Sequence, residues 1–172
     1  DAQKALSKKD CWKAQKFFRN LLSDFPGSHL VDDAQYGLGM AGFCSEDFVT
    51  AAFEFERLLN EYPTSPWVDE ARYQIGMCYY TSSQGIHHDQ DDTYKAIREF
   101  RRFVEDYPSS DLVPETEDRI EELNRKLGEK KLMIAQNYFR WRNYVSSIRY
   151  CDIILAEYSD PELIRNAWFV MA

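Results

Sequence analysis

Four stretches of the chain repeat one pattern of apolar positions, and each ends at an aromatic residue and a short polar linker. The linkers are Phe25-Pro26-Gly27-Ser28, Tyr62-Pro63-Thr64-Ser65, Tyr107-Pro108-Ser109-Ser110 and, more weakly, Tyr158-Ser159-Asp160-Pro161. Small or apolar residues precede each aromatic by eleven, seven and four positions. These offsets fall on one face of an α-helix. The pattern therefore predicts an amphipathic helix before each linker.

A second helix follows each of the first two linkers. Gly39 and Gly76 lie thirteen residues after the linker prolines, in the matching segments "AQYGLGMAGF" and "ARYQIGMCYY". Each unit is thus predicted to be a helical hairpin whose glycine and whose second-helix alanine, such as Ala51, let the two axes approach closely. A bulky residue at Gly76 or Ala51 is expected to open the hairpin. In the linker, Ser65 is expected to cap the next helix, with Pro66 at its first position.

These units predict an all-α fold, a tetratricopeptide-repeat-like solenoid of antiparallel helical hairpins forming an α-α superhelix. The hairpin units run roughly over 1–25, 29–62, 66–107 and 111–158, with the start of a further unit at 161–172. The segment "PETEDRIEELNRKL" predicts an added or extended helix, with Gly128 as its candidate break. Because both ends fall inside a unit, we expect a single solenoid that is a fragment of a longer one.

Composition narrows the class of protein. A hydrophobic content of 44% and an aromatic content of 15% are typical of an ordered globular chain. The formal charge of −8 disfavours binding to nucleic acid. No apolar run reaches the roughly 20 residues that span a bilayer, and the first ten residues do not form a signal peptide. Any anchor or targeting signal is therefore expected to have been removed or never to have existed.

The reactive residues indicate no catalytic centre. The four cysteines are widely spaced, form no C-x-x-C pair, and are interpreted as small buried hydrophobes that leave the compartment undecided: Cys11, Cys44, Cys78 and Cys151. No phosphate-binding glycine loop, nucleophile elbow or H-E-x-x-H motif occurs. We therefore expect neither an enzyme nor a cofactor.

One polar loop carries candidate metal ligands. The segment "HHDQDD" contains His87, His88, Asp89, Asp91 and Asp92, which could bind a divalent ion weakly. A polar loop between helices needs no metal to explain it, so no metal site is assigned. A metal-binding module or metal-dependent enzyme built on this loop is the alternative from another functional class.

The first helices of the hairpins carry the candidate binding groove, because aromatic residues and methionines share one face there. The groove residues are Tyr36, Met40 and Phe43 in one unit and Tyr73, Met77 and Tyr80 in the next, with Asp33 and Glu70 one turn earlier. Tyr36, Met40, Tyr73 and Met77 are expected to be exposed in the groove. Packing between hairpins is the competing interpretation, especially for the other two.

The hairpins resemble the tetratricopeptide repeat, although the proline spacings of 37 and 45 residues exceed its period of 34. Together with its insertions, the chain resembles the BamD family of outer-membrane β-barrel assembly lipoproteins. The resemblance rests on "AAFEFERLLNEYPTSPWVDEARYQIGMCYY", "DQDDTYKAIREFRRFVEDYPSSDLVPETEDRIEELNRKL" and "IAQNYFRWRNYVSSIRYCDIILAEYSD". Two departures are the missing N-terminal signal peptide with its lipid-bearing cysteine, and Ser159 in place of a linker proline.

The resemblance implies a periplasmic, non-catalytic scaffold that is anchored to the outer membrane by an N-terminal lipid absent from this chain. Its expected partners are unfolded outer-membrane protein precursors, the periplasmic domains of BamA and other subunits of the assembly complex. Arg140, Arg142 and Arg149 are the candidate docking residues for BamA. The acidic-Gln-x-x-Thr segment is implied to be structural. The rivals with the same fold are a Tol-associated cell-division coordinator and a secretin pilotin.

Overall fold

A computed structural model describes residues 10–172 of the chain. Within this range the protein is built of helices without strands, which confirms the predicted all-α class. The helices are α2 (Cys11–Asp24), α3 (Val31–Cys44), α4 (Phe48–Glu61), α5 (Val68–Ser82), α6 (Asp91–Asp106), α7 (Val113–Arg140), α8 (Tyr144–Glu157) and α9 (Pro161–Met171).

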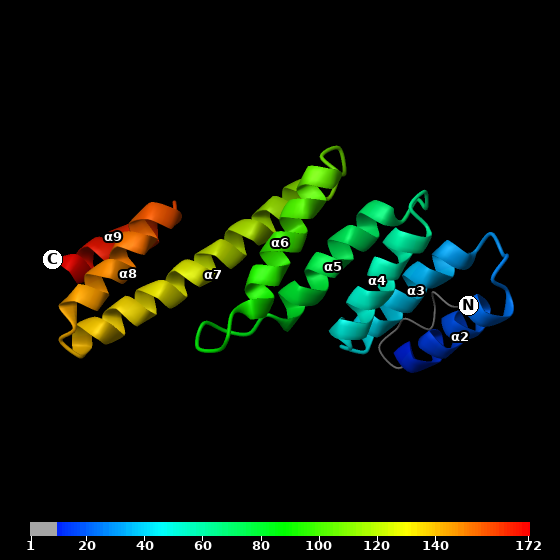
Figure 1. Cartoon of the computed structure of the whole chain (residues 1–172), viewed down its shortest axis with the longest axis horizontal. Coiled ribbons are helices and arrows are strands. Elements are labelled where there is room, and N and C mark those ends of the chain that lie inside the picture. Colours follow the sequence, from blue (N-terminus) through cyan, green and yellow to red (C-terminus); the bar gives the residue numbers. More distant parts are fainter. Residues whose placement is uncertain (1–9) are drawn as a thin grey trace.

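The helices follow one another along the solenoid in chain order (Figure 1). Each packs antiparallel against the next, and α7 also contacts α9. The turns within the hairpins lie along one long edge of the molecule, and the proline-containing linkers lie along the opposite edge (Figure 1). No described helix combines the length and apolar character needed to cross a membrane.

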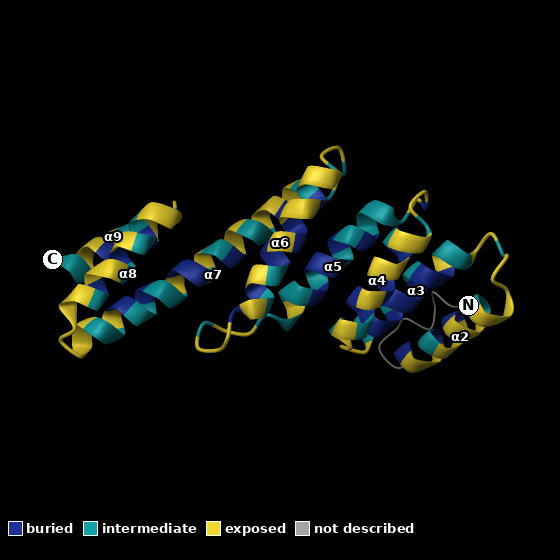
Figure 2. Ribbon diagram, viewed as in Figure 1, coloured by how far each residue is buried: buried dark blue, intermediate teal, exposed yellow. Residues whose placement is uncertain are grey.

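The core is a row of clusters along the solenoid, and the repeated small and aromatic residues form its centre. Ala51, Phe55, Ala96 and Phe100 are fully buried, as the repeat pattern predicts. Figure 2 shows this buried stripe running between helices whose outer faces are exposed. The clusters follow one another along the solenoid because each inner helix packs against both of its neighbours in the chain.

The glycine and the alanine that permit close approach within each hairpin meet different partners on the facing helix. A Cβ atom at Gly39 would lie 2.6 Å from the ring of Phe55, and one at Gly76 would lie 2.4 Å from the ring of Phe100. Each glycine therefore makes room for an aromatic ring, not for the alanine of the second helix. Ala51 instead faces Gly42, where an added Cβ would meet it at 3.2 Å.

Two linker serines, Ser65 and Ser110, connect neighbouring hairpins, and neither is the N-cap residue of the next helix. Helix α5 begins only at Val68, after a turn that also contains the linker prolines, so the predicted cap at Ser65 is wrong. The Ser65 hydroxyl donates to Asp32 over 2.7 Å. One repeat later, the hydroxyl of Ser110 donates to Asp69 over 3.1 Å. Each bond ties a linker to the first turn of the preceding first helix.

The turns α3–α4 and α7–α8 share one conformation. Glu46 and Arg142 occupy the same place in these turns and both have left-handed backbone angles, with φ of 62° and 59°. The next residue in each turn caps the following helix, because the side chains of Asp47 and Asn143 accept backbone N–H bonds from its first turn. The α5–α6 connection is longer and carries the loop 83–90.

Helix α7 has 28 residues and is not interrupted at Gly128, contrary to the predicted break. Gly128 is buried, and a Cβ atom there would lie 2.4 Å from Leu163 of α9. The glycine is thus needed for close packing of α9. The first part of α7 packs on α6, and its second part packs on α8 and α9. Its Lys126 and Lys130 donate to the 83–90 loop, at the Ser83 hydroxyl and the Ile86 carbonyl.

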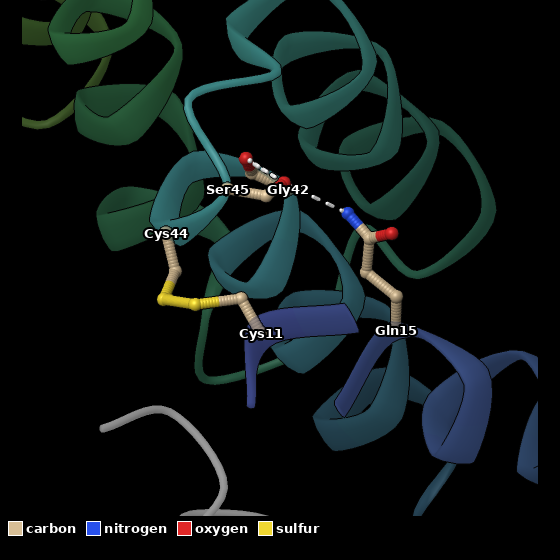
Figure 3. The surroundings of a disulfide bond; sticks show 5 residues. All are labelled: Cys11, Gln15, Gly42, Cys44 and Ser45. Atoms are coloured by element: carbon tan, nitrogen blue, oxygen red, sulfur yellow. Dashed lines mark hydrogen bonds between the residues drawn. A yellow bond between two sulfur atoms is a disulfide. The ribbon is translucent and has the colours of Figure 1, made fainter. Parts of the chain in front are cut away.

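Two of the four cysteines form a disulfide, which corrects their interpretation as small buried hydrophobes. Cys11 at the start of α2 is bonded to Cys44 at the end of α3, with their Cα atoms 5.9 Å apart (Figure 3). Beside it, the Gln15 amide donates to the Ser45 hydroxyl over 3.1 Å. The missing C-x-x-C pair could not exclude this bond, because helix packing brings together cysteines 33 residues apart. Disulfides of this kind persist in oxidising compartments.

Candidate peptide-binding and docking surfaces

The predicted groove residues are used largely to join one hairpin to the next. Tyr36 is half-buried and stacks on Trp67, with ring centroids 4.6 Å apart and an interplanar angle of 11°. The indole Nε1 of Trp67 donates to Asp33 over 2.7 Å. Burial, followed by the nearby carboxylate of Glu70, raises the pKa of Tyr36. Asp33 and Glu70 therefore hold aromatic groups at the α3–α5 junction.

Tyr73 is sealed within the core, so its expected exposure is wrong. Its side chain is 5% exposed and its ring packs against Phe100 and Phe103, with centroids 5.8 Å away in both cases. Its hydroxyl donates to Glu115 of α7 over 2.9 Å. Burial, and then the bond to Glu115, raise the pKa of Tyr73 to about 12. The tyrosine thus anchors α7 to the α5–α6 hairpin.

Tyr80 lies two turns further along α5 and repeats this arrangement on a more open surface. Its hydroxyl donates to Glu122 over 2.8 Å and accepts a bond from Arg119 over 2.9 Å. The guanidinium of Arg119 also lies 4.8 Å from the centre of the Tyr80 ring. Tyr80, Arg119 and Glu122 therefore form an accessible site that carries an aromatic ring, a cation and a carboxylate.

The remaining groove residues are half-buried. Met40 and Phe43 pack against the core of the α4–α5 junction, and Met77 packs against the core around Phe100. Phe43 also meets the ring of Phe48 edge-on at 5.2 Å. The structure does not bring the six predicted residues together in one open apolar groove. Their role in binding stays a prediction.

The first helices carry a row of carboxylates, of which only Glu70 is half-buried. We call this row, with the half-buried Arg119, the inner surface: Asp33, Glu70, Glu115, Arg119 and Glu122. The tyrosines Tyr36, Tyr73 and Tyr80 lie beneath or beside these groups. The sequence signal for these contacts was present, because each tyrosine and its glutamate lie one repeat apart.

The predicted docking arginines lie at the α7–α8 turn and are all exposed. Exposed apolar side chains, which the sequence did not predict, lie between these arginines. We call this set the terminal surface: Phe139, Arg140, Trp141, Arg142, Tyr144, Val145, Ile148 and Arg149. Trp141 is 72% exposed. Aromatic residues and arginine are the types enriched at the centres of protein interfaces, so this surface is suited to a protein partner.

The "HHDQDD" loop is organised around Gln90. The buried Gln90 amide donates to the carbonyls of Gly85, His88 and Asp89, and its oxygen accepts a bond from the buried hydroxyl of Thr93. These bonds agree with the structural role that the resemblance implies for the acidic-Gln-x-x-Thr segment. Among the described residues, no three His, Cys, Asp or Glu side chains are placed to hold a metal ion.

The stacked hairpins, the repeated linker bonds and the polar contacts between successive first helices define a helical repeat protein of tetratricopeptide type. The model of the YfiO family, described as outer membrane lipoprotein, matches residues 1–172, and the chain belongs to this family. No curated protein matches the chain.

Proposed function

We propose that the protein is a non-catalytic periplasmic scaffold of outer-membrane β-barrel assembly, of the BamD type, held at the membrane by a lipid on the full-length protein. The family match over the whole chain carries this proposal. A disulfide suits the oxidising periplasm. A scaffold role also fits the chemistry of the buried thiol, because burial raises the pKa of Cys78 to about 12 and keeps it protonated.

The terminal surface is the proposed docking site for the periplasmic domains of BamA. Large apolar side chains there are exposed to water, and covering them would supply the free energy of association. The three arginines supply charge-assisted hydrogen bonds at the rim. An acidic patch on the partner would therefore complement this end of a chain whose formal charge is −8.

Reversing one charge on the terminal surface tests this docking. Arg149→Glu is expected to weaken capture of purified BamA periplasmic domains about tenfold, because an attractive contact becomes a repulsive one. Trp141→Ala should weaken it further by removing an apolar anchor. Arg19→Glu on α2 makes the same charge change at another exposed position. This control should capture the domains as the parent protein does. Docking at the terminal surface is refuted if Arg149→Glu and Trp141→Ala also capture them normally, or if Arg19→Glu weakens capture as much as Arg149→Glu.

The inner surface is the proposed site for unfolded barrel precursors. The backbone N–H groups of an extended chain can donate hydrogen bonds to the carboxylates. Its aromatic side chains can lie against Tyr80 and the methionines Met40 and Met77. Unlike the groove predicted from the sequence, this surface does not need Tyr73 to be exposed. Recognition would depend on the carboxylate row and on the open Tyr80 site.

A peptide ending in phenylalanine, labelled with a fluorophore, tests this site by anisotropy. Asp33→Asn with Glu122→Gln removes two exposed carboxylates and keeps side-chain size, so it is expected to weaken binding several-fold without loss of helix. Glu105→Gln with Asp152→Asn makes the same change of charge on the second helices α6 and α8. Equal affinities for the two double variants would refute precursor binding at the inner surface.

A further inference from the structure

A groove lies between the second helices α4 and α6, with α5 as its floor. It encloses about 340 Å³ and is lined by Phe48, Val49, Ala52 and Phe53 from α4 and by Tyr79 from α5. Val49 and Phe53 are 84% and 61% exposed, although both are large apolar side chains. The groove is formed by second helices and is therefore separate from the inner surface and from the terminal surface.

The preceding junction has two links that this groove lacks. Phe48, Ala52 and Ser82 occupy the repeat positions that Cys11, Gln15 and Ser45 occupy 37 residues earlier. At the earlier junction the disulfide and the bond from the Gln15 amide to the Ser45 hydroxyl join α2 to the end of α3 (Figure 3). Phenylalanine at position 48 forms no disulfide, and alanine at position 52 has no amide with which to reach Ser82. The same architecture is thus cross-linked at one junction and not at the next.

One end of the groove is acidic. A smaller hollow of about 140 Å³ adjoins it, because the two share Ser82 and Asp92, and Asp89 and Asp91 also line this hollow. Glu56 lies on the α4 side of the groove. Lys95 is a basic residue of the lining, and it is held by Asp92 over 3.0 Å. Apolar side chains therefore lead into a region with an excess of carboxylates.

We propose that the α4–α6 groove binds a protein segment in which a large apolar side chain is flanked by lysine or arginine. The apolar side chain would cover Val49 and Phe53, whose exposure is otherwise unfavourable. The neighbouring cation would lie against Asp91, Asp92 and Glu56, where opposite charges attract. This proposal goes beyond docking and precursor binding, since it assigns a third surface and a different ligand chemistry.

Short labelled peptides with blocked ends test the ligand chemistry by anisotropy with the full chain. Lys-Leu-Phe-Lys is expected to bind saturably, and raising the salt concentration should weaken its binding. Glu-Leu-Phe-Glu and Lys-Ser-Ser-Lys are each expected to bind at least about tenfold more weakly, because one lacks the attraction of charge and the other lacks the apolar contact. Equal binding of all three peptides, or none at all, overturns the proposal.

Paired variants test the location. Val49→Ser with Phe53→Ser removes two exposed side chains, so folding should be kept while binding of Lys-Leu-Phe-Lys falls about tenfold. Phe17→Ser with Tyr94→Ser removes two exposed aromatics that do not line the groove, and should change binding less than about twofold. Equal losses in the two double variants would show nonspecific adhesion and refute the site. The Asp33→Asn and Glu122→Gln protein should bind this peptide normally, which separates the result from a failure of precursor binding.

Discussion

In the α5–α6 hairpin, Tyr73, Phe100 and Phe103 are packed against one another and closed off by α7. In the α7–α8 hairpin, Trp141 in the turn and Tyr144 at the start of α8 remain exposed. Both hairpins are rich in aromatic residues and follow the same repeat. The contrast teaches that aromatic content in a helical repeat protein does not identify a binding surface. A ring can form a binding surface only where the neighbouring helix does not cover it.

Removing one ring from each region tests whether the two regions differ in their contribution to stability. Phe100→Ala should lower the free energy of unfolding by about 4 kcal/mol, because the ring is fully buried and fills the space above Gly76. Trp141→Ala, at a residue of the α7–α8 turn that is 72% exposed, should change it by less than about 0.5 kcal/mol. Urea unfolding followed by circular dichroism measures both values. Similar losses would mean that the two regions do not differ as described.

The same contrast shows what the sequence could and could not predict. Offsets of small and aromatic residues such as Ala96 and Phe100 correctly indicated the helices and their buried faces, because helical period is a local property of the chain. The exposure of Tyr73 and Tyr80 depends on α7, whose glutamates lie 42 residues further along the chain. Local periodicity carries no information about such a neighbour.

The predictions for Gly128, Cys11 and Cys44 were wrong for a related reason. Gly128 was expected to break a helix because glycine is a weak helix former, but its role is set by contact with Leu163 of α9. Cys11 and Cys44 formed no short motif, and only their places in successive repeats put them side by side. In each case tertiary packing overrode the local interpretation.

Loss of the disulfide is expected to have the next largest effect on stability, at the α2–α3 junction. Replacing Cys11 and Cys44 by serine should lower the free energy of unfolding by roughly 3 kcal/mol, because the crosslink restricts the unfolded chain over a separation of 33 residues. Unfolding midpoints with and without a thiol reductant measure this contribution. The reductant should destabilise the parent protein and leave the double serine variant unchanged. A Cys78→Ala variant keeps the bond and should still respond to reductant.

The smallest expected effect concerns the hydroxyl that joins α5 to α7. Tyr73→Phe should cost about 1 kcal/mol, because it removes the bond to Glu115 while the ring stays packed, and because Glu115 is partly solvated. The pKa of Tyr73 is raised in the folded state from 10.0 to about 12. The unfolded chain therefore releases this proton first as the pH rises.

Stability from Tyr73 should accordingly be complete below pH 10 and fall between about pH 10 and 12. Over that interval the unfolding midpoint of the parent protein should decrease more steeply than that of Tyr73→Phe. Tyr144→Phe, which removes a phenol from an exposed side chain at the start of α8, is the control for the loss of a hydroxyl. Parallel curves of unfolding midpoint against pH for the parent protein and Tyr73→Phe would mean that folding does not raise the pKa of Tyr73. The buried α5–α7 junction would then differ less from the exposed terminal surface than the packing indicates.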